Sequence, residues 1–159
     1  MRLIFSVLIL FSFSVTNAQE TDELKVKNTI NAFFEGFHKQ DSVALRETVS
    51  TAIRMQTIGK NKEGGDSVRT VSFDNFVRSI VQIPDSVHFE ERLMAYSIQV
   101  DGSMAHAWTP YEFWVNDSFS HCGVNSFQLF KEGETWKILS IMDTRRKEDC
   151  KTKFPGKRD

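Results

Sequence analysis

The chain has 159 residues, of which 40% are hydrophobic and 14 are Phe, and its formal net charge is −1. A nearly neutral chain lacks the basic surface that general nucleic-acid binding requires, so we expect no nucleic-acid partner. Its length and apolar content are sufficient for one domain with a buried core.

The first 18 residues have the pattern of a secretory signal peptide. Arg2 supplies the positive start, residues 3–13 form an apolar run, and residues 16–18 place small side chains at the cleavage positions. The run is shorter than the roughly 20 residues that span a bilayer. We therefore expect residues 1–18 to be cleaved and the mature domain, 19–159, to be exported to the periplasm or the extracellular space. No stable membrane insertion should remain after cleavage; an uncleaved anchor is the alternative.

The first half of the mature chain is predicted to be mainly helical. Its expected elements are a helix at 22–38, a short helix ending at 49, a strand at 53–58, a polar loop at 60–70 and a third helix that Pro84 ends. Apolar residues recur every three or four positions in the first helix, as on one helical face. Asp41 or Ser42 can cap the second helix and Ser72 the third, because their side chains accept from free backbone N–H groups.

The second half is predicted to form a meander of four strands, at 87–100, 103–115, 118–131 and 135–146. Asp101-Gly102 and Asn116-Asp117 are strong signals for two-residue hairpin turns, and Gly133 lies in a third turn. Three helices followed by such a meander predict an α+β fold, in which a curved antiparallel sheet wraps around the helices. Residues 19–159 form one domain with a basic tail from about 147.

This order of elements resembles the nuclear transport factor two-like superfamily, which includes ketosteroid isomerase and polyketide cyclase (SnoaL-like) relatives. The likeness is greatest to an exported bacterial branch whose members are labelled lumazine-binding. The segments that carry it are 33–41, 100–102, 107–114 and 136–139. The resemblance implies a cone-shaped sheet, a ligand pocket inside the cone, and frequent homodimerisation through the sheet.

Hairpin geometry predicts which side chains line the pocket. A turn at 116–117 pairs Glu112 with His121, and a turn at 133–134 pairs His121 with Arg146. One face then collects Trp108, Glu112, Trp114, Phe119, His121, Asn125, Phe127, Leu129, Trp136, Ile138, Met142 and Arg146. We assign this face to the pocket because its aromatic content is the heavier. A bulge at Pro110 would shift the register beyond it.

The predicted row of Glu112, His121 and Arg146 suggests an acid–base site. A carboxylate beside His orients the ring and stabilises its charge, and Arg can bind an anionic substrate. The alternative is a cross-strand charge pair at the rim of the sheet, which is only structural. The ligand-binding residues expected around the row are Trp108, Trp114, Asn125, Met142 and Arg146. Asp143 becomes a pocket acid if the two faces are reversed.

Only two Cys residues, Cys122 and Cys150, are present. An exported protein can keep a disulfide, but this one requires the tail to double back after Arg146; a buried free Cys122 is the alternative. The His residues do not form pairs with the helical spacing of metal ligands, so we expect neither a metal nor another cofactor.

The preferred interpretation is an exported domain that binds a small aromatic or polar molecule, or a partner, and dimerises. The second is a cofactor-free isomerase, dehydratase or hydrolase that uses His121 with Glu112. The third is a structural module whose cone is filled by side chains. The size of the cavity separates the third interpretation from the other two.

Overall fold

The computed structural model describes residues 21–150, so the predicted signal peptide and its cleavage site lie outside the described residues. The elements in chain order are α1 (Asp22–His38), α2 (Ser42–Thr48), β1 (Val49–Lys60), β2 (Asp66–Val71), α3 (Phe73–Val81), β3 (Phe89–Leu93), β4 (Ser97–Asp101), β5 (Met104–Val115), β6 (Ser118–Glu132) and β7 (Thr135–Thr144). Within 21–150, no helix has the length and apolar character needed to cross a membrane.

The three helices begin at side chains that cap them. The Thr21 hydroxyl accepts from the backbone N–H of Leu24 ahead of α1. Asp41, the first of the two predicted candidates, caps α2. Ser72 caps α3, as predicted. Each cap satisfies backbone donors in the first turn that have no partner within the helix. The predicted helix at 22–38 is confirmed with the same bounds.

The strands form one seven-stranded sheet in the order β2-β1-β7-β6-β5-β3, and β4 also pairs with β5. β1 runs parallel to β7, whereas all the other pairs are antiparallel. The sheet is therefore mixed, not the purely antiparallel sheet predicted. The segment predicted as a loop at 60–70 also contains β2, which pairs with β1 as a hairpin arm.

The strand predicted at 87–100 is two strands, β3 and β4, which pair with different halves of β5. Leu93 pairs with Tyr111 and Ser97 pairs with Trp108, so three residues on one side of the interruption face two on the other. Pro110 lies opposite this break, and its carbonyl accepts from the Met94 backbone N–H at 2.8 Å. Proline has no N–H to continue the ladder, which is why pairing is interrupted there.

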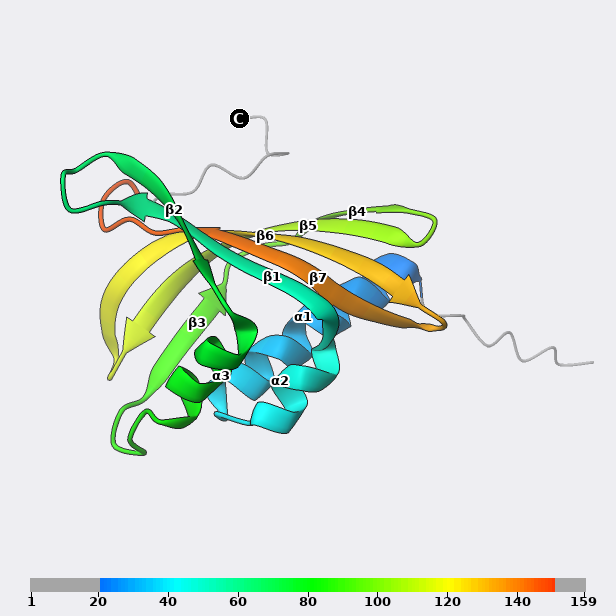
Figure 1. Cartoon of the computed structure of the whole chain (residues 1–159), viewed down its shortest axis with the longest axis horizontal. Helices are drawn as coiled ribbons and strands as arrows, with labels where there is room; N and C mark the ends of the chain where they lie inside the picture. Colours follow the sequence, from blue (N-terminus) through cyan, green and yellow to red (C-terminus); the bar gives the residue numbers. More distant parts are fainter. Residues whose placement is uncertain (1–20, 151–159) are drawn as a thin grey trace, which may run out of the picture.

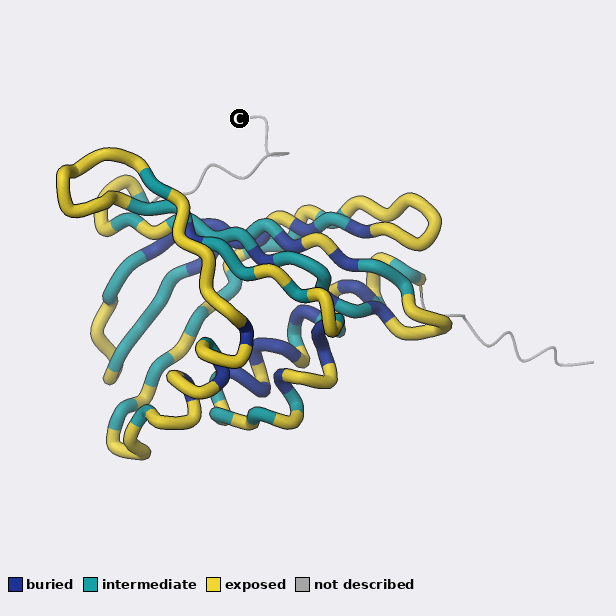
Figure 2. The backbone as a smooth tube through the Cα atoms, in the orientation of Figure 1, coloured by how far each residue is buried: buried dark blue, intermediate teal, exposed yellow. Residues whose placement is uncertain are grey.

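The sheet curls over the helices, and all three helices lie on its concave side (Figure 1). The buried stretches of α1 face the sheet (Figure 2). Core side chains from α1 include Val26, Ile30 and Phe34, which pack with Phe127, Leu129, Trp136 and Ile138 of β6 and β7. A cavity lies between α1, α3 and the concave side of the sheet.

Candidate functional site

Two β-bulges decide which side chains reach the cavity. In β6 the extra residue is Ser120: Trp114 pairs with Phe119, but Phe113 pairs with His121. The predicted pairing of Glu112 with His121 is therefore wrong, because Glu112 pairs with Cys122 instead. A bulge adds one residue to one strand, and since side chains alternate with period two, everything beyond it changes face relative to the prediction.

The second bulge lies in β7, where the extra residue is Leu139. Leu129 pairs with Ile138 as predicted, but Asn125 pairs with Asp143 in place of Met142. Arg146 accordingly pairs with Cys122 and not with His121. The predicted row of Glu112, His121 and Arg146 is thus not formed, and the half of β7 that follows the bulge presents its other side to the cavity.

The bulges divide the predicted site residues into two groups. His121 and Asn125 line the cavity, whereas its lining does not include Trp108, Glu112, Trp114, Met142 or Arg146. Trp108 is 39% exposed. Trp114 lies under the guanidinium of Arg92, with 4.6 Å between the cation and the ring centre, and donates to Glu112.

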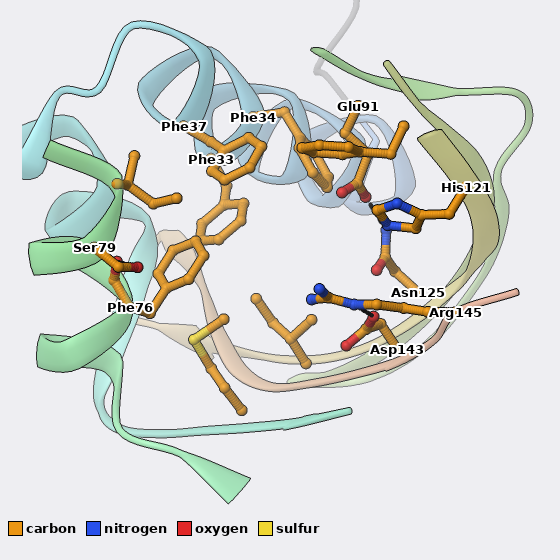
Figure 3. A pocket seen from close by; sticks show the side chains of 14 residues that line it. Phe33, Phe34, Phe37, Phe76, Ser79, Glu91, His121, Asn125, Asp143 and Arg145 are labelled. Carbon is orange, nitrogen blue, oxygen red and sulfur yellow. Dashed lines mark hydrogen bonds and ion pairs between the residues drawn. The ribbon is translucent and has the colours of Figure 1, made fainter. Parts of the chain in front are cut away.

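The cavity has a volume of about 260 Å³ and lies between α1, α3 and the concave side of the sheet. Its apolar walls are formed by Phe33, Phe34, Phe37, Met55, Phe76, Ile80, Phe113 and Ile141. Its polar side chains are Ser79, Glu91, His121, Asn125, Asp143 and Arg145, of which the last five gather on the sheet side, opposite α3 (Figure 3). An apolar cavity of about 150 Å³ can hold benzene. This cavity therefore has room for a ligand of about two rings.

Glu91 is the acid at the polar end of the cavity. It lies on β3 opposite Phe113, and its Oε1 accepts from the Asn125 side-chain amide at 2.6 Å. Burial, assisted by the charge of Asp143, raises the pKa of Glu91 to about 7, although the hydrogen bond from Asn125 and the charge of Arg145 oppose the rise. Glu91 therefore changes its charge near neutral pH, in the range where a carboxyl can act as both acid and base.

Asp143 and Arg145 form an anchored ion pair beside Glu91. Arg145 Nε donates to Asp143 Oδ2 at 2.8 Å, and the Thr57 hydroxyl donates to Asp143 Oδ1 at 2.6 Å. The Asp143 side chain is 12% exposed and that of Arg145 is 53% exposed. The carboxylate is thus held within the wall, while the guanidinium lies at the mouth with its terminal nitrogens directed into the cavity (Figure 3).

His121 packs in the same wall as an aromatic ring. It stacks on Phe113 at 4.9 Å and meets the edge of Tyr111 at 5.8 Å. Its Nδ1 pairs with the Ser120 hydroxyl at 3.1 Å, so its hydrogen-bond partner is that hydroxyl and not Glu112. Burial and the neighbouring charge of Arg145 lower the pKa of His121, which favours a neutral ring at pH 7.

Gly123 allows Tyr111 to pass close to β6. A Cβ atom at position 123 would lie 1.8 Å from the Thr144 carbonyl oxygen and 2.8 Å from the Tyr111 ring. Because that space is empty, the Tyr111 hydroxyl can donate to the Thr144 carbonyl at 3.0 Å. The glycine therefore fixes the wall behind Asp143, and no other residue fits there without moving a strand.

A disulfide joins Cys122 to Cys150. Arg146 and Cys122 first exchange two backbone hydrogen bonds of 2.9 Å, and the chain then turns back so that Cys150 reaches the strand again. Asp149 lies in this turn and has a left-handed backbone conformation, with a φ of 52°. The bond therefore fixes the segment that directly follows Arg145, one of the residues at the mouth of the cavity.

Sequence reasoning missed Glu91 and placed Asp143 and Arg145 on the face opposite the pocket. The bulges explain why Asp143 and Arg145 were placed on the wrong face. The alternative in which the two faces are reversed, and Asp143 is a pocket acid, matches the position of Asp143 in the cavity wall. Glu91 had a signal of its own, because it shares one face of β3 with Phe89 and Leu93. An acid between two inward apolar residues indicates a buried carboxyl. Within the described part of the chain, His, Cys, Asp and Glu form no group of three or more that could hold a metal ion.

Comparison with known proteins identifies the fold. No protein-family model matches the sequence, and no curated protein is significantly similar to it. Among solved structures, an NTF2-like protein of unknown function from Pseudomonas putida matches with a TM-score of 0.62 and 13% identity, over 86% of this chain and 96% of its own. A candidate dehydratase of the NTF2-like family from Streptomyces avermitilis matches with a TM-score of 0.60 and 15% identity, over 79% and 96%.

A candidate ketosteroid isomerase from Shewanella frigidimarina matches with a TM-score of 0.54 and 11% identity, over 75% of this chain and 94% of its own. At identities this low, the structural matches establish a common fold. The activities named for those proteins are not transferred to this chain. Together with the three helices held inside a curled, unclosed sheet, the matches show that this chain has the NTF2-like α+β cone fold.

Proposed function

We propose that this protein binds a small, mainly apolar molecule of one or two rings inside its cone. The observation that carries the proposal is the cavity of about 260 Å³, which has aromatic walls and one polar end. Apolar walls with a few convergent polar groups are the usual form of a small-molecule site. The walls bind the ring system through the area it removes from water, at about 25 cal/mol per Å². Glu91, Asn125 and Arg145 select its polar substituent.

Binding of 2-naphthol tests this function. We expect the compound to bind with one-to-one stoichiometry in isothermal titration calorimetry. Ser79→Trp places a bulky ring at the α3 side of the cavity and should weaken binding at least about tenfold, because the added side chain competes for the same space. Ser86→Trp, an exposed position outside the lining, is the matched control and should leave the affinity unchanged. Equal affinity in the two variants would place the ligand elsewhere.

A second candidate function is proton transfer without a cofactor. It is supported by the pKa of Glu91 near 7, which suits an acid–base catalyst at neutral pH, and it moves the base from His121 and Glu112 to Glu91. In such a reaction the Glu91 carboxylate accepts a proton from the carbon beside a carbonyl and then returns it to the same or a conjugated carbon. The carboxyl group ends in its starting state.

Proton exchange of 2-tetralone in deuterated buffer measures this second function. We expect the protein to accelerate deuterium incorporation beside the carbonyl, as followed by NMR, and Glu91→Gln to reduce that acceleration at least about 100-fold. His121→Phe keeps an aromatic ring against Phe113 and should retain most of it. A protein that binds the ketone without accelerating exchange is a binding domain only.

Export to an oxidising compartment is proposed from the signal-peptide pattern of residues 1–18, and the Cys122–Cys150 pair supports it because disulfides persist in such compartments. Homodimerisation through the outer side of the sheet is proposed on the exposure of Trp108 there, since a large exposed aromatic side chain is typical of the centre of an interface.

A further inference from the structure

The Arg145 guanidinium at the mouth of the cavity uses only some of its hydrogen-bond donors within the protein. Arg145 donates to Asp143 through Nε. A guanidinium carries five N–H donors, four of them on its two terminal nitrogens. Within residues 21–150, no hydrogen bond from those terminal nitrogens is present, and they point into the cavity (Figure 3). Asp143 therefore orients the guanidinium and leaves its planar fork available to a ligand.

The other polar groups in the wall favour a ligand group that accepts hydrogen bonds from Arg145. Both oxygens of Asp143 already accept, one from Thr57 and one from Arg145, so this acid has little capacity left for a ligand cation. Asn125 is engaged with Glu91. Glu91 is the remaining acid, and a cation bound to it would lie beside the charge of Arg145. A donor fork beside a protonatable carboxyl suits an anionic group with two oxygens.

We propose that the ligand of this cavity is a planar aromatic carboxylate of about two rings, whose carboxylate is bound by the terminal nitrogens of Arg145 while its rings lie between the Phe side chains of α1 and α3. This inference rests on the proposed binding function and adds the charge class of the ligand. Asp143 is a positioning residue for Arg145. Glu91 contributes by carrying a proton in the complex, since its ionised form would repel the ligand.

Three probes with one ring system separate the possible ligand classes: 2-naphthoate is anionic, 2-naphthamide is neutral and 2-(aminomethyl)naphthalene is cationic. We expect 2-naphthoate to bind the full chain at pH 6 at least about tenfold more tightly than the other two. Arg145→Gln should weaken 2-naphthoate about 10- to 100-fold and change 2-naphthamide less than about threefold. Arg54→Gln removes one exposed charge outside the lining and should change neither.

These measurements separate failure of the carboxylate assignment from failure of the binding function. If 2-naphthamide or the amine binds as tightly as 2-naphthoate, or if Arg145→Gln leaves 2-naphthoate binding intact, the carboxylate assignment is overturned and the binding function stands. If neither 2-naphthol nor any of the three probes binds, both fail. Arg145→Lys guards against loss of folding in the Gln variant: it keeps the charge but not the fork, and an intermediate loss of 2-naphthoate affinity is expected.

The pH dependence is an independent readout of the same assignment. The groups that face or adjoin Glu91 are Asp143 of β7, Arg145 directly after that strand, His121 of β6, Tyr111 of β5 and His38 of α1, which accepts from the Glu91 backbone N–H. A bound carboxylate favours protonated Glu91, so 2-naphthoate affinity should fall as pH rises from 6 to 8, by up to about tenfold per pH unit. Glu91→Gln should abolish this dependence. An affinity that rises over the same range would contradict the assignment.

Discussion

Replacing Cys150 by Ser is expected to destabilise the folded chain by about 3.5 kcal/mol. The disulfide joins residues separated by 28 positions, and closing a loop of that length removes this much conformational freedom from the unfolded chain in the loop-entropy model. For a domain of this size the loss corresponds to a decrease in melting temperature of about 10 °C. Urea denaturation of wild type and variant, without reducing agent, measures the free-energy difference directly.

Reduction of the wild-type protein is the matching control for this variant. With dithiothreitol present, wild type and Cys150→Ser should have the same free energy of unfolding, because both then lack the cross-link. Cys122→Ala should behave like Cys150→Ser, with a small additional loss, since the Cys122 side chain is only 1% exposed and packs in the sheet. A difference below about 1 kcal/mol between oxidised wild type and Cys150→Ser would show that the loop contributes little in this protein.

The helices were predictable because their signals are local. The apolar spacing along 22–38 and the caps at Asp41 and Ser72 each involve neighbours within one turn, so the sequence contains everything that determines them. The strands were mostly predictable for the same reason, since their turns are marked by Asn116-Asp117 and Gly133. The parallel pairing of β1 with β7 was not predictable, because it joins segments far apart in the chain and carries no turn signal.

The site was less predictable than the fold because it depends on two single residues. Ser120 and Leu139 are ordinary strand residues, and nothing in their side chains indicates that each is the extra residue of a bulge. Each bulge exchanged the two faces over half a hairpin, which moved Trp108 and Glu112 out of the expected pocket. The aromatic content of the strands was also a poor guide to the pocket face. The aromatic walls of the cavity come largely from Phe side chains of α1 and α3, whereas Trp108 and Trp114 lie outside its lining.

Glu91 is expected to destabilise the fold at neutral and alkaline pH. Its pKa is 4.5 in an ordinary environment and about 7 in the folded chain. Between these values the folded chain holds a proton that the unfolded chain has lost, so the free energy of unfolding falls as pH rises from 4.5 to 7. Above pH 7 the carboxyl is ionised in both states, and the full penalty of burying its charge remains.

Glu91→Gln should therefore stabilise the protein at pH 8, by at most about 3 kcal/mol. The gain should shrink as pH is lowered and vanish below pH 4.5, where Glu91 is protonated in both states. The Gln side-chain oxygen can still accept from Asn125, so the wall keeps its hydrogen bond. Glu90→Gln is the matched control, because Glu90 is adjacent but 51% exposed, and it should change stability by less than about 0.5 kcal/mol at either pH.

A carboxyl that weakens its own fold is informative about function. Selection for stability alone would favour an amide or an apolar side chain at position 91, whereas a binding or proton-transfer site requires a group that can gain and lose a proton. We therefore expect opposite effects in one variant: Glu91→Gln gains stability at pH 8 and loses both exchange of 2-tetralone and the pH dependence of 2-naphthoate binding. If denaturation at pH 8 shows Glu91→Gln to be less stable than wild type, Glu91 is a structural partner of Asn125 and not a strained functional acid.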